Sequence, residues 1–168
     1  SHMKEYIDNY LIKQDIFFEC ILTEYLYLES EQIFIWVGNP GMFTDFDMSK
    51  NPFIRMCFTE VSEFVHVFPD FKPNKFEHCK VHFFSKDYTG VYDSENSYLT
   101  KLENGKYQIK IIINYLLGSI QFNFTDFNIE TKYSKFIKDV NGKKGTFLDI
   151  ETNQKIDCDQ PFGKLDSC

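Results

Sequence analysis

The stretch that decides the fold is residues 120–127, which read IQFNFTDF. Apolar side chains occupy alternate positions from Ile120 to Phe124, a period of two that is typical of a strand with one buried face. The alternation slips at Asp126, because the next apolar side chain comes one position late, at Phe127. One extra residue in a strand reverses the face that each later side chain occupies, so the slip predicts a β-bulge.

The same pattern occurs upstream in residues 54–61, which read IRMCFTEV. Here the alternation slips at Glu60 and resumes at Val61. Two bulged strands of this kind are predicted to be equivalent members of two facing sheets. A chance similarity between two strands of a Phe-rich chain is the alternative explanation.

Outward from these two segments, strand-like and turn-like stretches follow one another along the chain. Gly, Pro and Asn separate the apolar runs, and Asn104-Gly105 is the typical sequence of a tight hairpin turn. Apolar residues at helical spacing predict a short amphipathic helix over residues 4–12. The predicted strands are residues 16–28, 33–37, 53–68, 78–85, 98–102, 107–117, 119–132, 146–150 and 155–158.

These elements predict a mainly β (α+β) fold, either an antiparallel β-sandwich or a strongly bent sheet with a short N-terminal helix. The length suits a single β-rich domain, residues 3–168, because Ser1 and His2 are typical of a cloning scar. The sequence has no βαβ alternation and no Gly-rich phosphate-binding motif. A parallel nucleotide-binding sheet is therefore not expected.

Composition points to β structure and to a particular class of partner. Aromatic residues make up 18% of the chain, with 19 Phe and 10 Tyr, and such side chains favour strands. The formal net charge is −7, and Arg55 is the single arginine. Phosphate contacts need Lys and Arg, so neither nucleic acid nor an anionic membrane is an expected partner. A basic protein partner is favoured through electrostatic steering, and the alternative is that the negative charge serves solubility alone.

Five cysteines lie at long, irregular spacings without a Cys-x-x-Cys motif, which is not the pattern of a disulfide framework. Cys20 and Cys57 fall within apolar strands, where a free thiol behaves as a small apolar side chain. No signal peptide and no apolar run of about 18 residues is recognisable. The expected location is therefore cytoplasmic, unless a signal peptide has been removed.

Three residue patterns raise the question of metal binding or catalysis. His78 and His82 flank Cys79, but on a strand they lie about 13 Å apart, too far for one ion unless His66 joins them from another strand. No motif places a base beside a Ser or Cys nucleophile. Carboxylate pairs are common in an acidic protein and are expected to form a solvated face. The sequence therefore predicts a protein that is not an enzyme and has no cofactor or metal.

A small, acidic β protein rich in Phe and Tyr, with a strand such as IQFNFTD at residues 120–126, resembles bacterial immunity proteins, which neutralise toxin domains. The resemblance is one of overall character and transfers no individual residue. It implies that the protein occludes a basic toxin or enzyme, with carboxylates pairing with Lys or Arg around the partner's active site and aromatic residues in the buried centre. A small apolar-ligand-binding β protein is the alternative.

The candidate partner-binding carboxylates are those in predicted loops or bulges: Asp45, Asp47, Glu60, Glu63, Asp87, Asp93 and Glu95. Trp36 joins them as a candidate anchor, because Trp is enriched at interface hot spots, and a place in the core is the alternative for it. Tyr25 and Tyr27 fall on the more polar face of the first strand. They are expected either to line a partner surface or to cover a second sheet.

Overall fold

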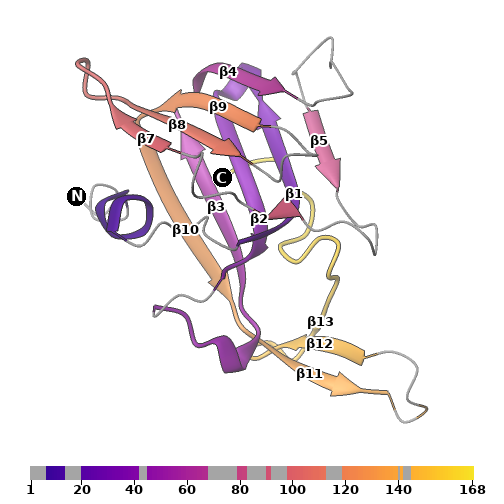
Figure 1. Ribbon diagram of the computed structural model, residues 1–168. Helices are drawn as coiled ribbons and strands as arrows, with labels where there is room; N and C mark the ends of the chain where they lie inside the picture. The colour runs from indigo at the N-terminus through magenta and orange to yellow at the C-terminus, as the bar shows by residue number, and fades with distance from the viewer. Residues whose placement is uncertain are drawn as a thin grey trace.

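The computed structural model describes residues 7–13, 20–41, 45–67, 79–82, 90–91, 98–112, 119–139, 141 and 145–168. Within these residues the protein is mainly β, as predicted, with a short N-terminal helix, η1 (Ile7–Lys13), whose Ile7 and Leu11 side chains are buried (Figure 1). Two shorter helical turns follow, η2 (Glu29–Glu31) and η3 (Met48–Lys50). The strands are β1 (Ile21–Leu28), β2 (Ile33–Asn39), β3 (Phe53–Thr59), β4 (Ser62–Val67), β5 (Cys79–His82), β6 (Gly90–Val91), β7 (Tyr98–Lys101), β8 (Tyr107–Ile112), β9 (Ser119–Phe124), β10 (Asp126–Lys132), β11 (Ser134–Lys138), β12 (Gly145–Asp149) and β13 (Lys155–Ile156).

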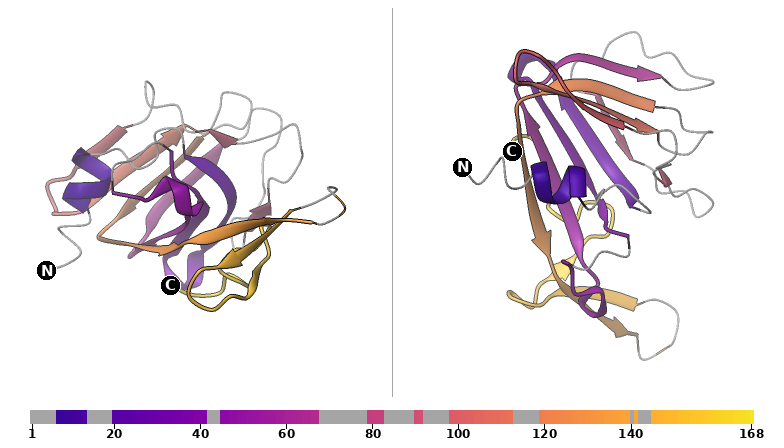
Figure 2. Two further views of the ribbon diagram at one scale, coloured as in Figure 1. Left: turned by 90° about the horizontal axis from the view of Figure 1, so that it is seen from below. Right: turned by 60° about the vertical axis from the view of Figure 1, so that its left-hand side comes forward.

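The described strands form three antiparallel sheets. The largest has six strands in the order β10-β3-β2-β1-β5, with β6 also pairing with β1. The second has four strands in the order β4-β9-β8-β7, and the third has three in the order β11-β12-β13. Strands β7 to β9 lie across one face of β1 to β3, so the two larger sheets form the two layers around the core (Figures 1 and 2). The third sheet extends away from these layers.

Two strands pass from one large sheet to the other at the positions where the apolar alternation slips. The chain bends at Glu60, so that β3 belongs to the six-stranded sheet and β4 to the four-stranded sheet. The returning chain bends at Thr125, between β9 and β10. Phe124 and Phe127 are three residues apart, so in one regular strand they would point to opposite faces. Both are buried because the chain changes sheet between them, and each points from its own sheet into the shared core.

The two bent strands pair with each other on both sides of the bend, β3 with β10 and β4 with β9. Residues 54–59 lie in β3 of the six-stranded sheet and residues 120–124 lie in β9 of the four-stranded sheet, so the two similar segments belong to facing sheets, as predicted. After the slip in its alternation, each chain segment passes into the opposite sheet. At the bend, the Thr125 N–H donates to the Thr59 carbonyl oxygen (3.2 Å). The Val61 N–H donates to the Gln32 carbonyl oxygen (2.8 Å), so backbone groups remain paired where the chain leaves the ladder.

Aromatic rings from both large sheets fill the space between them. Phe58 of β3 contacts Phe34 of β2 in its own sheet, with ring centroids 6.0 Å apart. Across the core it contacts Phe122 and Phe124 of β9, at 5.1 and 4.9 Å. All four side chains are fully buried. Ring pairs at these separations attract one another beyond the effect of burial, so the high Phe content builds the inter-sheet core.

Strand β1 is buried on both faces. The sequence predicts that Tyr25 and Tyr27 lie on a more polar face of this strand, opposite a buried face with the leucines, and this prediction is wrong. A bulge between Leu22 and Glu24 reverses the facing. Leu22, Tyr25 and Tyr27 consequently pack in the inter-sheet core, whereas Leu26 packs on the outer face of the sheet. The two tyrosines therefore cover the second sheet, which is one of the two alternatives that the sequence left open.

The C-terminal segment, residues 161–168, covers the outer face of the six-stranded sheet. Its Leu165 side chain is 4% exposed. The Phe162 ring lies next to the cationic groups of Arg55 (5.5 Å) and Lys132 (5.1 Å), and the Lys132 ammonium donates to the Pro161 carbonyl oxygen (2.9 Å). The apolar residues of the sheet that pack around Leu165 are Leu26, Leu28, Ile33, Ile35, Val37 and Cys57.

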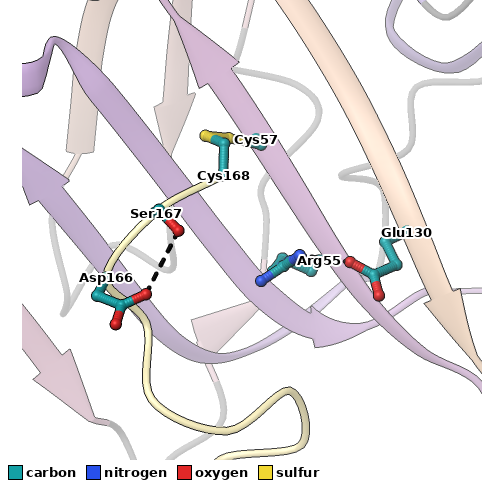
Figure 3. Close-up of a disulfide and its surroundings, with 6 residues drawn as sticks. All are labelled: Arg55, Cys57, Glu130, Asp166, Ser167 and Cys168. Atoms are coloured by element: carbon teal, nitrogen blue, oxygen red, sulfur yellow. Dashed lines mark hydrogen bonds and ion pairs between the residues drawn. A yellow bond between two sulfur atoms is a disulfide. The ribbon is translucent and has the colours of Figure 1, made fainter.

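A disulfide between Cys57 of β3 and Cys168 fixes the C-terminal segment to the sheet (Figure 3). The two Cα atoms are 5.8 Å apart, although 111 residues separate them in sequence. Figure 3 also shows Arg55 beside Glu130, with which it forms an ion pair between β3 and β10. The prediction that Cys57 is a free apolar thiol is therefore wrong, because spacing along the chain does not reveal which cysteines the fold brings together.

The third sheet is predicted only in part by the sequence. The hairpin of β12 and β13 is confirmed, but β11 lies outside every predicted strand. Phe136 and Ile137 are adjacent in β11, and two neighbouring apolar residues give no alternation from which a strand can be recognised.

Candidate functional site

The acidic residues predicted to bind a partner separate into two groups at opposite ends of β3. Glu60 and Glu63 are exposed and lie at the bend that follows this strand. Asp45 and Asp47 are exposed and precede it, beside η1 and η3. A strand of this length spans about 20 Å, so the two groups do not share one surface patch.

Two further glutamates lie beside Glu60 and Glu63. The bond from the Val61 N–H to the Gln32 carbonyl joins the bend to the turn between β1 and β2, and that turn carries Glu29 and Glu31 on η2. Both glutamates are exposed, and in the part of the chain that the structure describes none of the four carboxylates is in an ion pair. We call this group the acidic corner: Glu29, Glu31, Glu60 and Glu63. The sequence shows Glu29 and Glu31 only as members of a polar turn, because their neighbours in space come from the bend between β3 and β4.

The acidic corner lies beside aromatic and apolar side chains. The Tyr27 ring stacks on Phe64 of β4, with centroids 4.0 Å apart. Burial, and then the nearby Glu29 carboxylate, raise the pKa of Tyr27. Val65, two residues beyond Glu63, is 47% exposed. The corner therefore combines negative charge with an apolar contact at its border.

The backbone at the acidic corner adopts an unusual conformation. Glu60 and Glu63 are both in the left-handed region, with φ of 53° and 52°. This conformation costs a residue with a Cβ atom about 1 kcal/mol, whereas glycine adopts it readily. Glu63 also lies within the irregularity of β4 between Ser62 and Val65. Non-glycine residues held in this region concentrate at functional positions.

Asp45 and Asp47 bind groups of the protein itself. Asp45 Oδ2 accepts a hydrogen bond from the Asn9 side-chain amide of η1 (3.1 Å). Asp47 caps η3 by accepting from the Ser49 N–H (3.1 Å), and its carboxylate lies 3.7 Å from the Lys50 ammonium. Hydrogen bonds from Ser49, and then the charge of Lys50, lower the pKa of Asp47. These contacts give both aspartates a local structural role.

The remaining predicted site residues do not join the acidic corner. Asp87, Asp93 and Glu95 lie outside the described residues. Trp36 is fully buried in the inter-sheet core, so its side chain is not on the surface and the core alternative holds for it. Burial raises the pKa of the Cys20 thiol to about 12, and a hydrogen bond with Trp36 acts in the opposite direction.

A buried Tyr–His pair connects the two large sheets. The Tyr25 hydroxyl of β1 lies 2.7 Å from Nδ1 and 2.9 Å from Nε2 of His66 of β4. His66 is 4% exposed, and burial lowers its pKa from 6.5 to about 3. The imidazole is therefore neutral at pH 7, and a ring nitrogen forms a hydrogen bond with the tyrosine hydroxyl. Among the residues described, no three His, Cys, Asp or Glu side chains gather as a metal site around this pair or elsewhere.

We expect the protein to lose stability as the pH falls from 6.5 towards 3, because His66 is then protonated in the unfolded chain but still neutral in the folded one. The unfolded state binds more protons over this range, so the free energy of unfolding rises with pH. His66→Gln removes this difference. Urea unfolding at several pH values should show a weaker pH dependence for the variant, and equal slopes for the two proteins would contradict the assignment.

An open hollow of about 820 Å³ lies beside β12 and β13. Its lining includes Cys158 together with Lys155, Asp157 and Asp159. Burial, and then the two aspartate carboxylates, raise the pKa of Cys158. A thiol with a raised pKa is a weak nucleophile at neutral pH, so this hollow contains no activated cysteine.

Comparison of the chain with protein-family models, with curated protein sequences and with solved structures finds no match. None of the helices in the described part of the chain is long and apolar enough to cross a membrane. The acidic corner is therefore the candidate site on the strength of its own geometry.

Proposed function

We propose that this chain is a protein-binding module whose acidic corner docks onto a basic surface of another protein. An immunity protein of the bacterial type, which occludes the active site of a basic toxin or enzyme, is the class that this description fits best. The observation that carries the proposal is that four exposed glutamates lie at one corner, two on the β1–β2 turn and two at the β3–β4 bend, and that the latter two are held in left-handed backbone.

The left-handed backbone conformation of Glu60 and Glu63 supports a binding role, because a bend with a purely structural role would be more stable with glycine or asparagine at these positions. Glycine at Glu60 or Glu63 would avoid the conformational cost, and asparagine would reduce it. Glutamate at these positions puts negative charge at an exposed bend. Complementary charges on a partner would then increase the rate of association and specify its orientation.

The aromatic core argues against the alternative of an apolar-ligand carrier. Phe34, Phe58 and Phe122 contact one another across the two large sheets. A ligand entering between these strands would have to separate rings that already pack together, at a cost similar to that of creating a cavity.

The proposal predicts nanomolar binding to a basic protein encoded next to this gene, with an affinity that falls as salt is raised. Glu60→Gln combined with Glu63→Gln removes two negative charges while keeping side chains of similar size. We expect this double variant to bind about tenfold more weakly, corresponding to about 1.4 kcal/mol, when both proteins are titrated in a calorimeter at low salt.

Glu151→Gln combined with Asp159→Asn provides the matched control, since it also removes two negative charges, both at exposed positions outside the acidic corner. It should leave the affinity unchanged at every salt concentration. Undetectable binding of the neighbouring gene product at micromolar concentration would refute the proposed function. An equal loss of affinity in this double control would show that overall charge, rather than the acidic corner, is recognised.

A further inference from the structure

The third sheet carries charge of the opposite sign to the rest of the protein. Residues 132–145, which cover β11 and the turn into β12, contain five lysines and one aspartate, a formal charge of +4. The whole chain has 18 basic and 25 acidic residues, so 13 basic and 24 acidic residues remain elsewhere, a formal charge of −11. We call the strands β11 and β12 the basic arm. Its position away from the two core layers is clear in both ribbon views (Figures 1 and 2).

The root of the basic arm is fixed to the body of the protein. Ser134 is 1% exposed, and its hydroxyl donates to the Asn51 carbonyl oxygen (2.9 Å). The rings of Phe53 and Phe147 meet edge to face at 5.7 Å. The Ile150 N–H donates to the Tyr133 carbonyl oxygen (3.1 Å). The arm therefore projects from a rigid base.

Beyond its root, β11 is exposed on both faces. Neighbouring residues of a strand point to opposite faces, and Phe136 and Ile137 are each 46% exposed. The Phe136 ring rests against Gly145 and against Phe147, whose ring centroid is 5.0 Å away, but nearly half of its surface remains open. Lys135 and Lys138 flank these two residues and are exposed as well. Each face of β11 thus offers one apolar and one cationic side chain.

The edge of β11 is also available for backbone hydrogen bonding. Within the described residues β11 pairs with β12 alone and is the outer strand of its sheet. An outer strand presents backbone N–H and C=O groups that can pair with an added strand. Such groups are costly to bury in lipid, where they find no partner, so an open edge favours a protein ligand over a membrane.

We infer that β11 binds an extended acidic segment of a partner protein by strand addition along its open edge. The residues opposite Lys135, Phe136, Ile137 and Lys138 would then be acidic, apolar, apolar and acidic, so that each cation meets a carboxylate and each apolar side chain an apolar one. This order is the same in either strand direction. Lysines on an edge strand oppose pairing between two copies of the arm, which leaves the edge to a partner of opposite charge.

The test uses the full chain and three synthetic peptides of ten residues. The first contains Glu-Val-Ile-Glu at its centre, the second contains Lys-Val-Ile-Lys, and the third repeats the first with N-methylated backbone amides that cannot pair with a strand edge. Fluorescence anisotropy measures the binding of each peptide. We expect micromolar binding of the first peptide and at least tenfold weaker binding of the other two.

Variants of the protein locate the binding. Lys135→Glu combined with Lys138→Glu should weaken the binding of the first peptide at least tenfold. The control, Lys101→Glu combined with Lys164→Glu, changes the net charge equally at exposed positions outside the arm and should have little effect on this binding. Glu60→Gln combined with Glu63→Gln should leave peptide binding intact, because the basic arm acts independently of the acidic corner. Hydrogen exchange should show slower exchange of β11 amides when the first peptide is bound.

Three results would overturn the inference. Equal binding of the N-methylated peptide would show attraction by charge alone, without strand addition. Saturable binding to vesicles containing phosphatidylserine, or to a single-stranded oligonucleotide, without binding of the acidic peptide would assign the arm to a different class of ligand. Concentration-dependent self-association abolished by Lys135→Glu would assign it to a second copy of this chain.

Discussion

Replacing Phe58 with alanine is expected to lower the free energy of unfolding by about 3–5 kcal/mol. Phe58 is fully buried and its ring contacts rings from both large sheets, including Phe34, Phe122 and Phe127. Removing the ring takes away its own burial and leaves a cavity bordered by side chains that cannot all collapse into it. The loss would be a large fraction of the 5–15 kcal/mol that is roughly typical of a domain.

Urea unfolding followed by circular dichroism measures this effect, and Phe136→Ala is the matched control. Phe136 is also a strand phenylalanine with a ring neighbour, but it is 46% exposed and lies on the basic arm. Its replacement should cost about half as much or less, because nearly half of the side chain is already exposed and its removal leaves no enclosed cavity. Comparable destabilisation by the two substitutions would contradict the two-layer core described above.

Cys168→Ser is expected to reduce the free energy of unfolding by about 4 kcal/mol. The disulfide with Cys57 spans 111 residues, and closing so long a loop removes much of the entropy of the unfolded chain. The substitution would also free the C-terminal segment from the outer face of the sheet, where Leu165 now shields an apolar surface. Treatment of the unchanged protein with a dithiol reductant should give a loss of the same size.

Cys158→Ser is the control for this substitution, because Cys158 is exposed and its thiol is free. We expect its urea midpoint to match that of the unchanged protein, and equal midpoints for the two serine variants would show that the disulfide contributes nothing. Disulfides persist in oxidising compartments and are rare in cytosolic proteins. The cytoplasmic location expected from the sequence therefore stays a prediction, which the redox state of Cys57 and Cys168 in cells would test.

Local periodicity in the sequence was sufficient to predict the class of the fold and the position of its bend. The alternation of residues 54–61 and 120–127 slips at Glu60 and at Asp126, and the chain changes sheet at or next to these positions. A period of two shows which face of the strand each side chain occupies. A break in this alternation is visible in the sequence, because it does not depend on distant parts of the chain. Glu60 and Glu63 were found as candidate residues for the same reason.

The bulge in β1 and the burial of Trp36 were beyond the reach of the sequence. Periodicity distinguishes an apolar from a polar face of a strand. Both faces of β1 and β2 are buried, so a bulge that reverses the two faces does not visibly change the sequence pattern. Nothing local separates a core tryptophan from one at an interface, since both are flanked by apolar residues. Only the packing of the second sheet over Trp36 decided its place.

The sequence by itself determined that the chain forms antiparallel strands, that two of them bend, and that its acidic residues outnumber its basic ones. Tertiary structure alone decided that Glu29 and Glu31 lie beside Glu60, that Cys57 meets Cys168, and that Lys135 and Lys138 lie on the outer strand of a projecting sheet. The reason is that the alternation of apolar and polar residues involves only neighbours along the chain. A surface patch or a disulfide instead joins segments far apart in sequence, and these come together only when distant strands pair.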